Sequence, residues 1–146
     1  MGLIQKLTDK VVFFDTAPLI YYIEENPNYL KILDKLFEAN NNGKFLLQTS
    51  VITLIEVLIH PMRENQMTLV QKYQDILRHS STIELFDINT DVSILAAKYR
   101  AKYGLRTPDA IQIATAVDAG AGFFLTNDLK LKNVNEIEVL ILDDMK

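Results

Sequence analysis

A short apolar segment that stops at a carboxylate constrains the fold of this 146-residue chain most strongly. Residues 11–14 read Val-Val-Phe-Phe, a run typical of a strand that is buried on both faces of a parallel sheet. Asp15 follows directly, and Thr16 is expected to be the N-cap of a helix over residues 16–23. Asp15 is therefore expected where ligands bind in open α/β sheets, although a carboxylate there can also serve only as a helix cap.

Strands and helices alternate along the rest of the sequence. Further strands are expected at 45–49, 83–88, 123–126 and 139–142, and further helices at 29–39, 51–60, 62–79, 90–103 and 108–119. Residues 1–10 are expected to be a polar lead-in, and Pro61 is expected to end the helix before it. The alternation predicts an α/β fold, a three-layer sandwich with a central, mostly parallel sheet of about five strands flanked by helices. Residues 1–146 are expected to form a single domain.

Composition excludes several classes of site. The chain has no cysteine and only two histidines, so disulfides and thiolate metal sites are excluded and most zinc chemistry is unexpected. There are 15 basic and 19 acidic residues, which give a net charge of −4. No apolar stretch is as long as a membrane span and no signal pattern is present, so we expect a cytoplasmic protein without membrane association.

Glu56 lies in an otherwise apolar helical segment. Burying a carboxylate there costs free energy unless it is paired or bound to something. The alternative is that Glu56 shares a narrow solvent-exposed stripe with Thr53 and His60, which are spaced three and four residues from it. The pattern alone leaves both interpretations open.

Two more acids are placed where they can join Asp15. Asn127-Asp128 follows directly after the strand at 123–126. Asp109 opens a helix after Thr107, which is the expected cap, and a proline. Asp109 reaches the same edge of the sheet only if the chain returns between helices 90–103 and 108–119, which requires an extended link or an oblique first helix.

Such a group of carboxylates predicts a bound divalent cation. Like charges raise one another's pKa, and a cation removes that repulsion. All-oxygen ligands select Mg²⁺ or Mn²⁺ over zinc or copper. These ions activate water and stabilise the charge that develops in phosphoryl transfer.

The order of these motifs resembles the PIN-domain nucleases, and most narrowly the VapC-type ribonuclease toxins of type II toxin–antitoxin modules. The matching segments cover essentially the whole chain and are the strand ending in Asp15-Thr16, the helix from Ser50 to Glu56, the run from Thr107 to Ala114, and the strand followed by Thr126-Asn127-Asp128. The resemblance implies Mg²⁺-dependent endoribonuclease activity, with Mn²⁺ as a substitute. It also implies an RNA substrate, a small antitoxin partner and a homodimer.

By the resemblance, Asp15, Glu56, Asp109 and Asp128 would be the metal-binding acids. The residues themselves add a hypothesis for the mechanism. Asp15, Glu56 and Asp109 would hold one Mg²⁺, while Asp128 would help with a second ion or orient the attacking water. Cleavage would leave a 5′-phosphate and a 3′-hydroxyl. The expected substrate-binding residues are Thr16, Arg106, Thr126 and Asn127.

Basic residues near the acids are candidates for holding flanking phosphates. They are Lys98, Lys102 and Arg106 before Asp109, and Lys130 and Lys132 after Asp128. Ordinary solvated surface is the more common explanation of such residues.

Two related folds are excluded by single positions. A haloacid-dehalogenase-like phosphatase needs a second acid two residues after the first, and that position is Ala17. A phosphate-receiver domain needs an acid pair after its first strand, where Phe14-Asp15 supplies one. A PIN-fold protein that binds RNA or a partner without cleaving, and a PIN nuclease in RNA processing outside a toxin–antitoxin system, remain alternatives.

Overall fold

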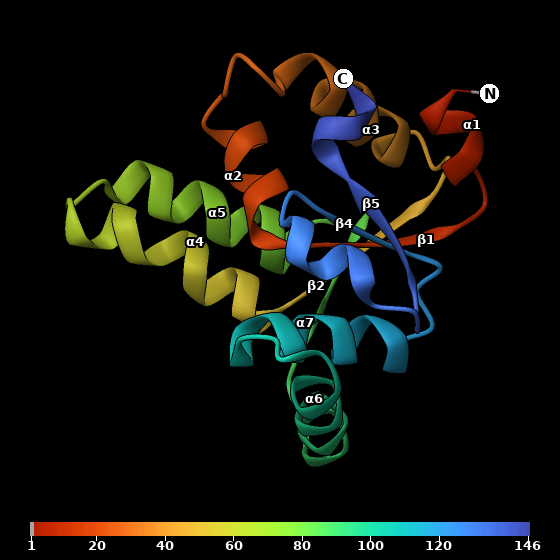
Figure 1. Cartoon of the computed structure of the whole chain (residues 1–146). Coiled ribbons are helices and arrows are strands. Elements are labelled where there is room, and N and C mark those ends of the chain that lie inside the picture. Colours follow the sequence, from red (N-terminus) through yellow and green to blue (C-terminus); the bar gives the residue numbers. More distant parts are fainter. Residues whose placement is uncertain (1) are drawn as a thin grey trace.

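Five short parallel strands form one sheet within residues 2–146, the part of the chain that this computed structural model describes (Figure 1). The strands are β1 (Val11–Phe14), β2 (Leu46–Ser50), β3 (Ile83–Phe86), β4 (Phe123–Thr126) and β5 (Glu138–Ile141). Their order is β3-β2-β1-β4-β5, and every neighbouring pair is parallel. The predicted α/β fold with a central parallel sheet is confirmed.

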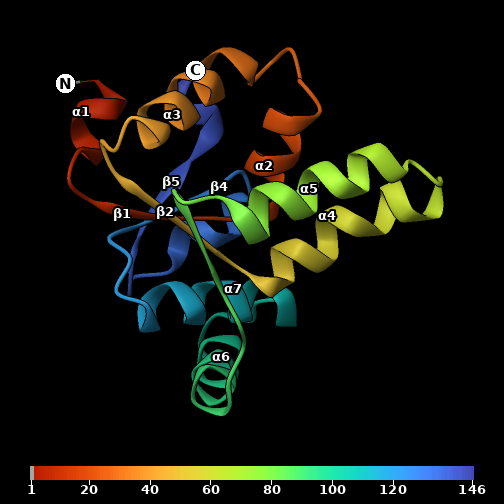
Figure 2. The ribbon, with the colours of Figure 1, turned by 180° about the vertical axis from the view of Figure 1, so that it is seen from behind.

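Helices cover both faces of this sheet. The helices on one side are α1 (Leu3–Leu7), α2 (Thr16–Ile23), α3 (Leu30–Asn41), α4 (Val51–Arg63) and α5 (Met67–His79), and those on the other are α6 (Thr90–Tyr103) and α7 (Thr107–Asp118). The α4–α5 pair projects to one side of the molecule (Figure 2). Two 3-10 turns complete the chain, η1 (Leu129–Asn133) after β4 and η2 (Leu142–Met145) after β5. Among residues 2–146, no helix combines the length and apolar character needed to cross a membrane.

Alternating side chains on the central strand build two hydrophobic cores. Val12 and Phe14 pack with α2, α3 and α5, whereas Phe13 packs with α6 and α7, and all three are fully buried. Phe13 stacks on Phe124 of β4 with ring centroids 5.5 Å apart. Because β1 is buried on both faces, its sequence is continuously apolar, as predicted for a central parallel strand.

Two helix starts differ from the prediction. Asp15, rather than Thr16, is the N-cap of α2, and its Oδ1 accepts a 2.8 Å hydrogen bond from the Thr16 amide. Helix α7 already includes Thr107, with Arg106 at the cap position and no side-chain cap. In both cases the residue before the expected cap has the extended backbone that the cap position requires.

The prediction that Pro61 ends its helix is wrong. Helix α4 continues to Arg63, and α5 begins only at Met67 instead of residue 62. Proline removes one backbone hydrogen bond from the helix, but the ring of Pro61 is buried, and this contact offsets the loss. The polar lead-in expected at residues 1–10 is also wrong for the described residues, because α1 forms and Leu7 is fully buried in the core.

The link between α6 and α7 brings Asp109 to the edge of the sheet where the strands end, the carboxyl edge. Gly104 ends α6 in the left-handed conformation with φ +69°, and the Arg100 guanidinium donates to the Leu105 carbonyl. In Figure 1, α6 is seen almost end-on while α7 runs across the page, so the two helices cross. Of the two predicted possibilities, the oblique first helix is present, and Asp109 lies in the same cleft as Asp15.

We expect Gly104→Ala to lower the free energy of unfolding by about 1 kcal/mol, because a Cβ is disfavoured at this positive φ. Gly122→Ala is the matched control, since the new Cβ would meet only the Val11 carbonyl oxygen at 3.7 Å and the φ of Gly122 is not in the left-handed region. Urea titration of both variants measures the difference. Equal stabilities would show that the left-handed turn does not constrain the link.

Candidate active site

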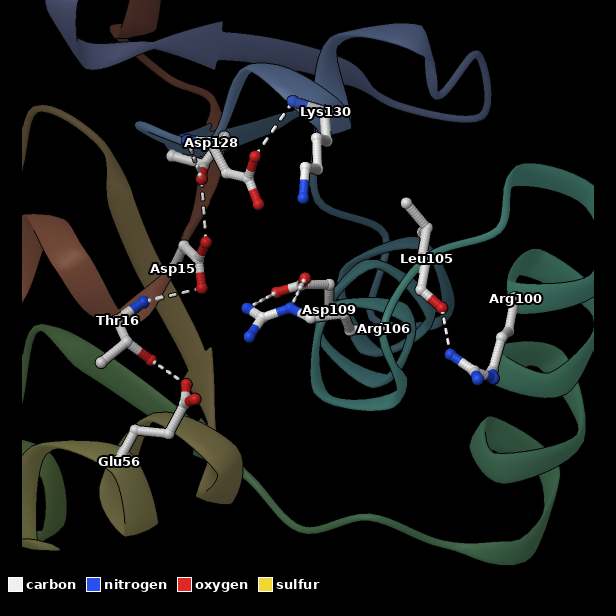
Figure 3. Close-up of polar contacts among 10 residues, drawn as sticks. Asp15, Thr16, Glu56, Arg100, Leu105, Arg106, Asp109, Asp128 and Lys130 are labelled. Carbon is white, nitrogen blue, oxygen red and sulfur yellow. Dashed lines mark hydrogen bonds and ion pairs between the residues drawn. The ribbon is translucent and has the colours of Figure 1, made fainter.

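A single cleft at the carboxyl edge gathers all four predicted acids. Its volume is about 410 Å³, and we call it the acidic cleft. Asp15 and Asp128 follow β1 and β4, Glu56 lies on α4, and Asp109 lies in the first turn of α7 (Figure 3). Arg106 is the one basic residue among those that line the cleft. Four carboxylates facing one cation leave the cleft strongly negative.

Asp15 is held at the centre of this arrangement by two hydrogen bonds. Its Oδ1 accepts from the Thr16 amide at 2.8 Å, and its Oδ2 accepts from the Thr126 hydroxyl at 2.8 Å. Burial raises the pKa of Asp15; the two hydrogen bonds oppose that shift, and the charges of Asp109 and Glu56 add to it. An ionised Asp15 therefore carries an electrostatic penalty that a nearby cation would remove.

Glu56 is positioned by a chain of buried side chains. The Gln112 amide donates to the Thr53 hydroxyl at 2.7 Å, and that hydroxyl is also hydrogen-bonded to those of Thr49 at 2.8 Å and Thr16 at 3.2 Å. The Thr16 hydroxyl then donates to Glu56 Oε1 at 2.6 Å. A solvent stripe shared by Glu56 and Thr53 is therefore wrong, because Thr53 is fully buried.

Gln112 connects the helix that carries Asp109 to this chain. Its amide lies three residues after Asp109 on α7, is buried, and also accepts from the Ser50 hydroxyl. A buried amide is costly unless its donors and acceptors are used, so the contact fixes α7 against α4. Sequence reasoning missed Gln112, because only the folded chain brings α7 beside residues 50 and 53.

Asp109 forms an ion pair with Arg106. The Arg106 Nε lies 3.0 Å from Asp109 Oδ2, and its Nη2 lies 3.4 Å from Oδ1. The arginine side chain is 71% exposed, whereas that of Asp109 is 12% exposed. Contact with Asp109 raises the pKa of Arg106, and the charges of Asp128 and Glu56 add to the shift. The guanidinium therefore acts as the counter-ion of Asp109 in this structure, and its predicted contact with a substrate phosphate stays a prediction.

Thr126, Asn127 and Asp128 bind mainly to the protein itself. The Thr126 hydroxyl is fully buried and accepts from the Asp128 amide at 3.1 Å. The Asn127 amide nitrogen donates to the Tyr29 hydroxyl at 3.0 Å, and its oxygen accepts from the Asp143 amide at 3.0 Å. Thr126 and Asn127 thus position the loop after β4, and their contact with substrate stays a prediction.

Most of the predicted flanking basic residues also have acidic partners. Lys102 pairs with Glu136 at 2.8 Å, and Lys132 pairs with Asp144 at 3.4 Å. These contacts fit the solvated-surface interpretation of both lysines.

Sequence reasoning missed Tyr21, which lines the acidic cleft from α2.

The acids are close but do not form a closed cage. Within residues 2–146, no three His, Cys, Asp or Glu side chains approach one another closely enough to hold one ion together. This arrangement still suits Mg²⁺, which keeps several waters and is usually held by one or two protein carboxylates. The donor set therefore fits a hard divalent cation, and the spacing leaves room for water and a phosphate.

Comparison with known proteins places the fold in a family. The model of the PIN domain family matches residues 12–137. Curated protein sequences give no match.

Several solved structures share the fold at low sequence identity. VapBC2 from Rickettsia felis, bound to a DNA fragment of its promoter, superposes with a TM-score of 0.70 at 18% identity, over 90% of this chain and 98% of that chain. A toxin–antitoxin complex from Klebsiella pneumoniae gives a TM-score of 0.66 at 23% identity, over 90% and 97%. VapC20 from Mycobacterium tuberculosis, a sarcin–ricin loop cleaving toxin, gives 0.68 at 16% identity, over 87% and 98%.

We expect Asp15→Asn to stabilise the metal-free protein at neutral pH. Because burial raises the pKa of Asp15 above its ordinary value of 3.8, the folded state binds this proton more tightly than the unfolded state. The wild type therefore loses stability as the pH rises from that value through the raised pKa, and the variant lacks this loss. Urea midpoints in EDTA, compared across that range, measure the difference. The exposed Asp118 supplies the control Asp118→Asn, and a variant profile parallel to wild type would contradict the assignment.

Proposed function

Because the chain belongs to the PIN domain family, we propose that it is a metal-dependent endoribonuclease that hydrolyses RNA phosphodiester bonds. The observation that carries this proposal is the convergence of four carboxylates, from four separate segments, on one cleft. Stability alone does not explain that convergence, since like charges brought together destabilise the fold. VapC20, which has the same fold, is a sarcin–ricin loop cleaving toxin, and this supports a cleaving activity here.

Asp15, Glu56, Asp109 and Asp128 would hold Mg²⁺, with Mn²⁺ as a substitute. Their oxygens are the ligands that these ions prefer. When bound, the ion lowers the pKa of water and stabilises the negative charge that develops on the phosphoryl oxygens.

The chain's own groups have separate tasks. The Thr16 amide and the Thr126 hydroxyl hold the Asp15 carboxylate in the cleft and favour its ionised form, against the burial that raises its pKa. Asp128 Oδ1 accepts from the Lys130 amide at 3.0 Å, while its Oδ2 accepts no hydrogen bond from residues 2–146. This free oxygen can orient the attacking water and accept its proton.

Arg106 would change partner during the reaction cycle. A cation at Asp109 would compete with the guanidinium for the same carboxylate oxygens. Once released, the exposed guanidinium can bind a phosphate through two parallel hydrogen bonds. Its substrate-binding role therefore depends on prior neutralisation of Asp109.

We further propose that the protein acts in the cytoplasm as the toxin of a toxin–antitoxin pair and forms a homodimer. The Rickettsia felis and Klebsiella pneumoniae structures are complexes of this kind. Ile55, Ile59 and Met62 are exposed along one side of α4, and such an apolar strip is typical of a protein interface. Co-expression with an adjacent small reading frame should give a complex and relieve growth inhibition. If neither a complex nor relief of growth inhibition is observed, the toxin role is contradicted. The alternative is then a nuclease in RNA processing outside a toxin–antitoxin pair.

Metal binding can be tested without cleavage. Mg²⁺ or Mn²⁺ at about 100 times its dissociation constant should stabilise the fold by about 2.7 kcal/mol through mass action. Calorimetric melting temperatures of wild type and Glu56→Gln, with and without the ion, measure this effect. The shift should shrink in Glu56→Gln and persist in Asp118→Asn. An unchanged melting temperature in folded wild type would contradict the metal site.

Asp109→Asn tests catalysis. The variant keeps the size of the side chain but removes a metal-binding charge, so cleavage should fall by orders of magnitude, at about tenfold for each 1.4 kcal/mol of lost transition-state stabilisation. Asp118→Asn, at the other end of the same helix, should cleave like wild type. RNA cleavage rates with Mn²⁺ and with EDTA, beside metal-free melting temperatures, separate catalysis from folding. Wild-type protein that binds RNA but does not cleave it with either metal would favour the binding-protein alternative.

A further inference from the structure

A second hollow, close to the acidic cleft, carries the opposite charge. Its volume is also about 410 Å³, and its basic residues are Lys31 and Lys35 of α3 and Lys146 at the end of the chain. The other side chains that line it are uncharged. We call it the lysine hollow.

One aromatic side chain connects the two cavities. The Tyr29 ring stacks on that of Tyr21, with centroids 4.5 Å apart and planes 8° from parallel, and Tyr21 lines the acidic cleft. Lys146 Nζ lies 4.7 Å from the centroid of the same Tyr29 ring. The Tyr29 hydroxyl accepts from Asn127, which also lines the acidic cleft. A stacked tyrosine pair thus forms the boundary between a negative and a positive cavity.

The two helical lysines lack internal partners. Among residues 2–146, neither Lys31 nor Lys35 lies within 4.0 Å of a carboxylate, whereas Lys146 is shared with Asp143 at 3.5 Å. Like charges four residues apart on a helix repel each other. Burial raises the pKa of Tyr22 and the charge of Asp34, on the same helix as the two lysines, adds to that shift; Asp34 does not line the hollow. An external anion would relieve the repulsion between Lys31 and Lys35.

We propose that the lysine hollow binds backbone phosphates of single-stranded RNA that extends from the acidic cleft across Tyr21 and Tyr29. This inference rests on the proposed function, because a strand cut in the cleft has to continue beyond it. The acids repel the phosphates that flank the cleavage point, so those phosphates need cations outside the cleft. The tyrosine pair favours RNA over an acidic peptide, since bases stack on aromatic rings largely without sequence preference.

The double variant Lys31→Gln/Lys35→Gln tests the inference. Its matched control is Lys10→Gln/Lys44→Gln, two exposed lysines that precede β1 and β2 and so lie at the opposite edge of the parallel sheet. Fluorescence anisotropy measures binding of a single-stranded RNA of about 12 nucleotides and one of about three nucleotides. Ca²⁺ replaces Mg²⁺, and a gel confirms that the RNA stays intact.

We expect the double variant to bind the longer RNA about 25-fold more weakly at about 0.1 M salt, because each phosphate that a lysine neutralises on a single strand contributes about fivefold to the affinity under that condition. The slope of log affinity against log salt should fall by about 1.4. Binding of the short RNA, and the affinities of the control variant, should stay at the wild-type values. Melting temperatures confirm that all variants are folded.

Other outcomes overturn the inference. Equal affinities of the double variant and wild type for the longer RNA would refute the lysine hollow while leaving the proposed function intact. An equal loss of affinity in the control variant would show that the effect comes from the overall charge of the protein and not from the lysine hollow. Weakened binding of a glutamate-rich peptide, with RNA binding unchanged, would assign the hollow to an acidic protein segment. Absence of RNA binding by wild type would refute both proposals.

Discussion

The carboxylate of Asp15 follows the central strand of the sheet, and the rest of the site depends on how its charge is accommodated. Parallel pairing with β4 provides the Thr126 hydroxyl, and the start of α2 provides the Thr16 amide. Both hydrogen bonds favour the ionised form, while burial and the neighbouring acids oppose it. The fold therefore holds a carboxylate at a place where its ionised form is disfavoured. Groups with such perturbed pKa values are typical of functional sites.

The parts that could be predicted from sequence are those that depend on local pattern. The continuous apolar run of β1 specifies a strand buried on both faces, and Asn89 and Ser50, residue types that favour helix caps, accept hydrogen bonds from the first turns of α6 and α4. Asp15 and Asp128 come after strand ends, and Glu56 lies in the second turn of a helix that follows a strand, so their place at one edge follows from parallel topology. The crossing of α6 and α7 is one of the two arrangements that the short link between them allowed.

Contacts between distant segments could not be predicted in this way. Gln112 is an ordinary polar residue until α7 packs beside Thr53, and Tyr29 gains a role only when η2 returns to Asn127. Helix α4 continues through Pro61 because burial of the proline ring outweighs a local rule. Arg106 shows the same limit: its spacing from Asp109 is visible in the sequence, but its use as an internal counter-ion depends on side-chain geometry.

The hydrogen bond between the Asp143 amide and Asn127 gives the last turn of the chain an additional property. Because Asn127 adjoins Asp128, any rearrangement of the loop after β4 has to break or move this bond. Exchange of that single backbone proton with solvent deuterium is then coupled to events in the cleft. The C-terminal turn therefore provides a spectroscopic reporter of the site. A tag fused after Lys146 would lie next to this reporter and would change its exchange rate.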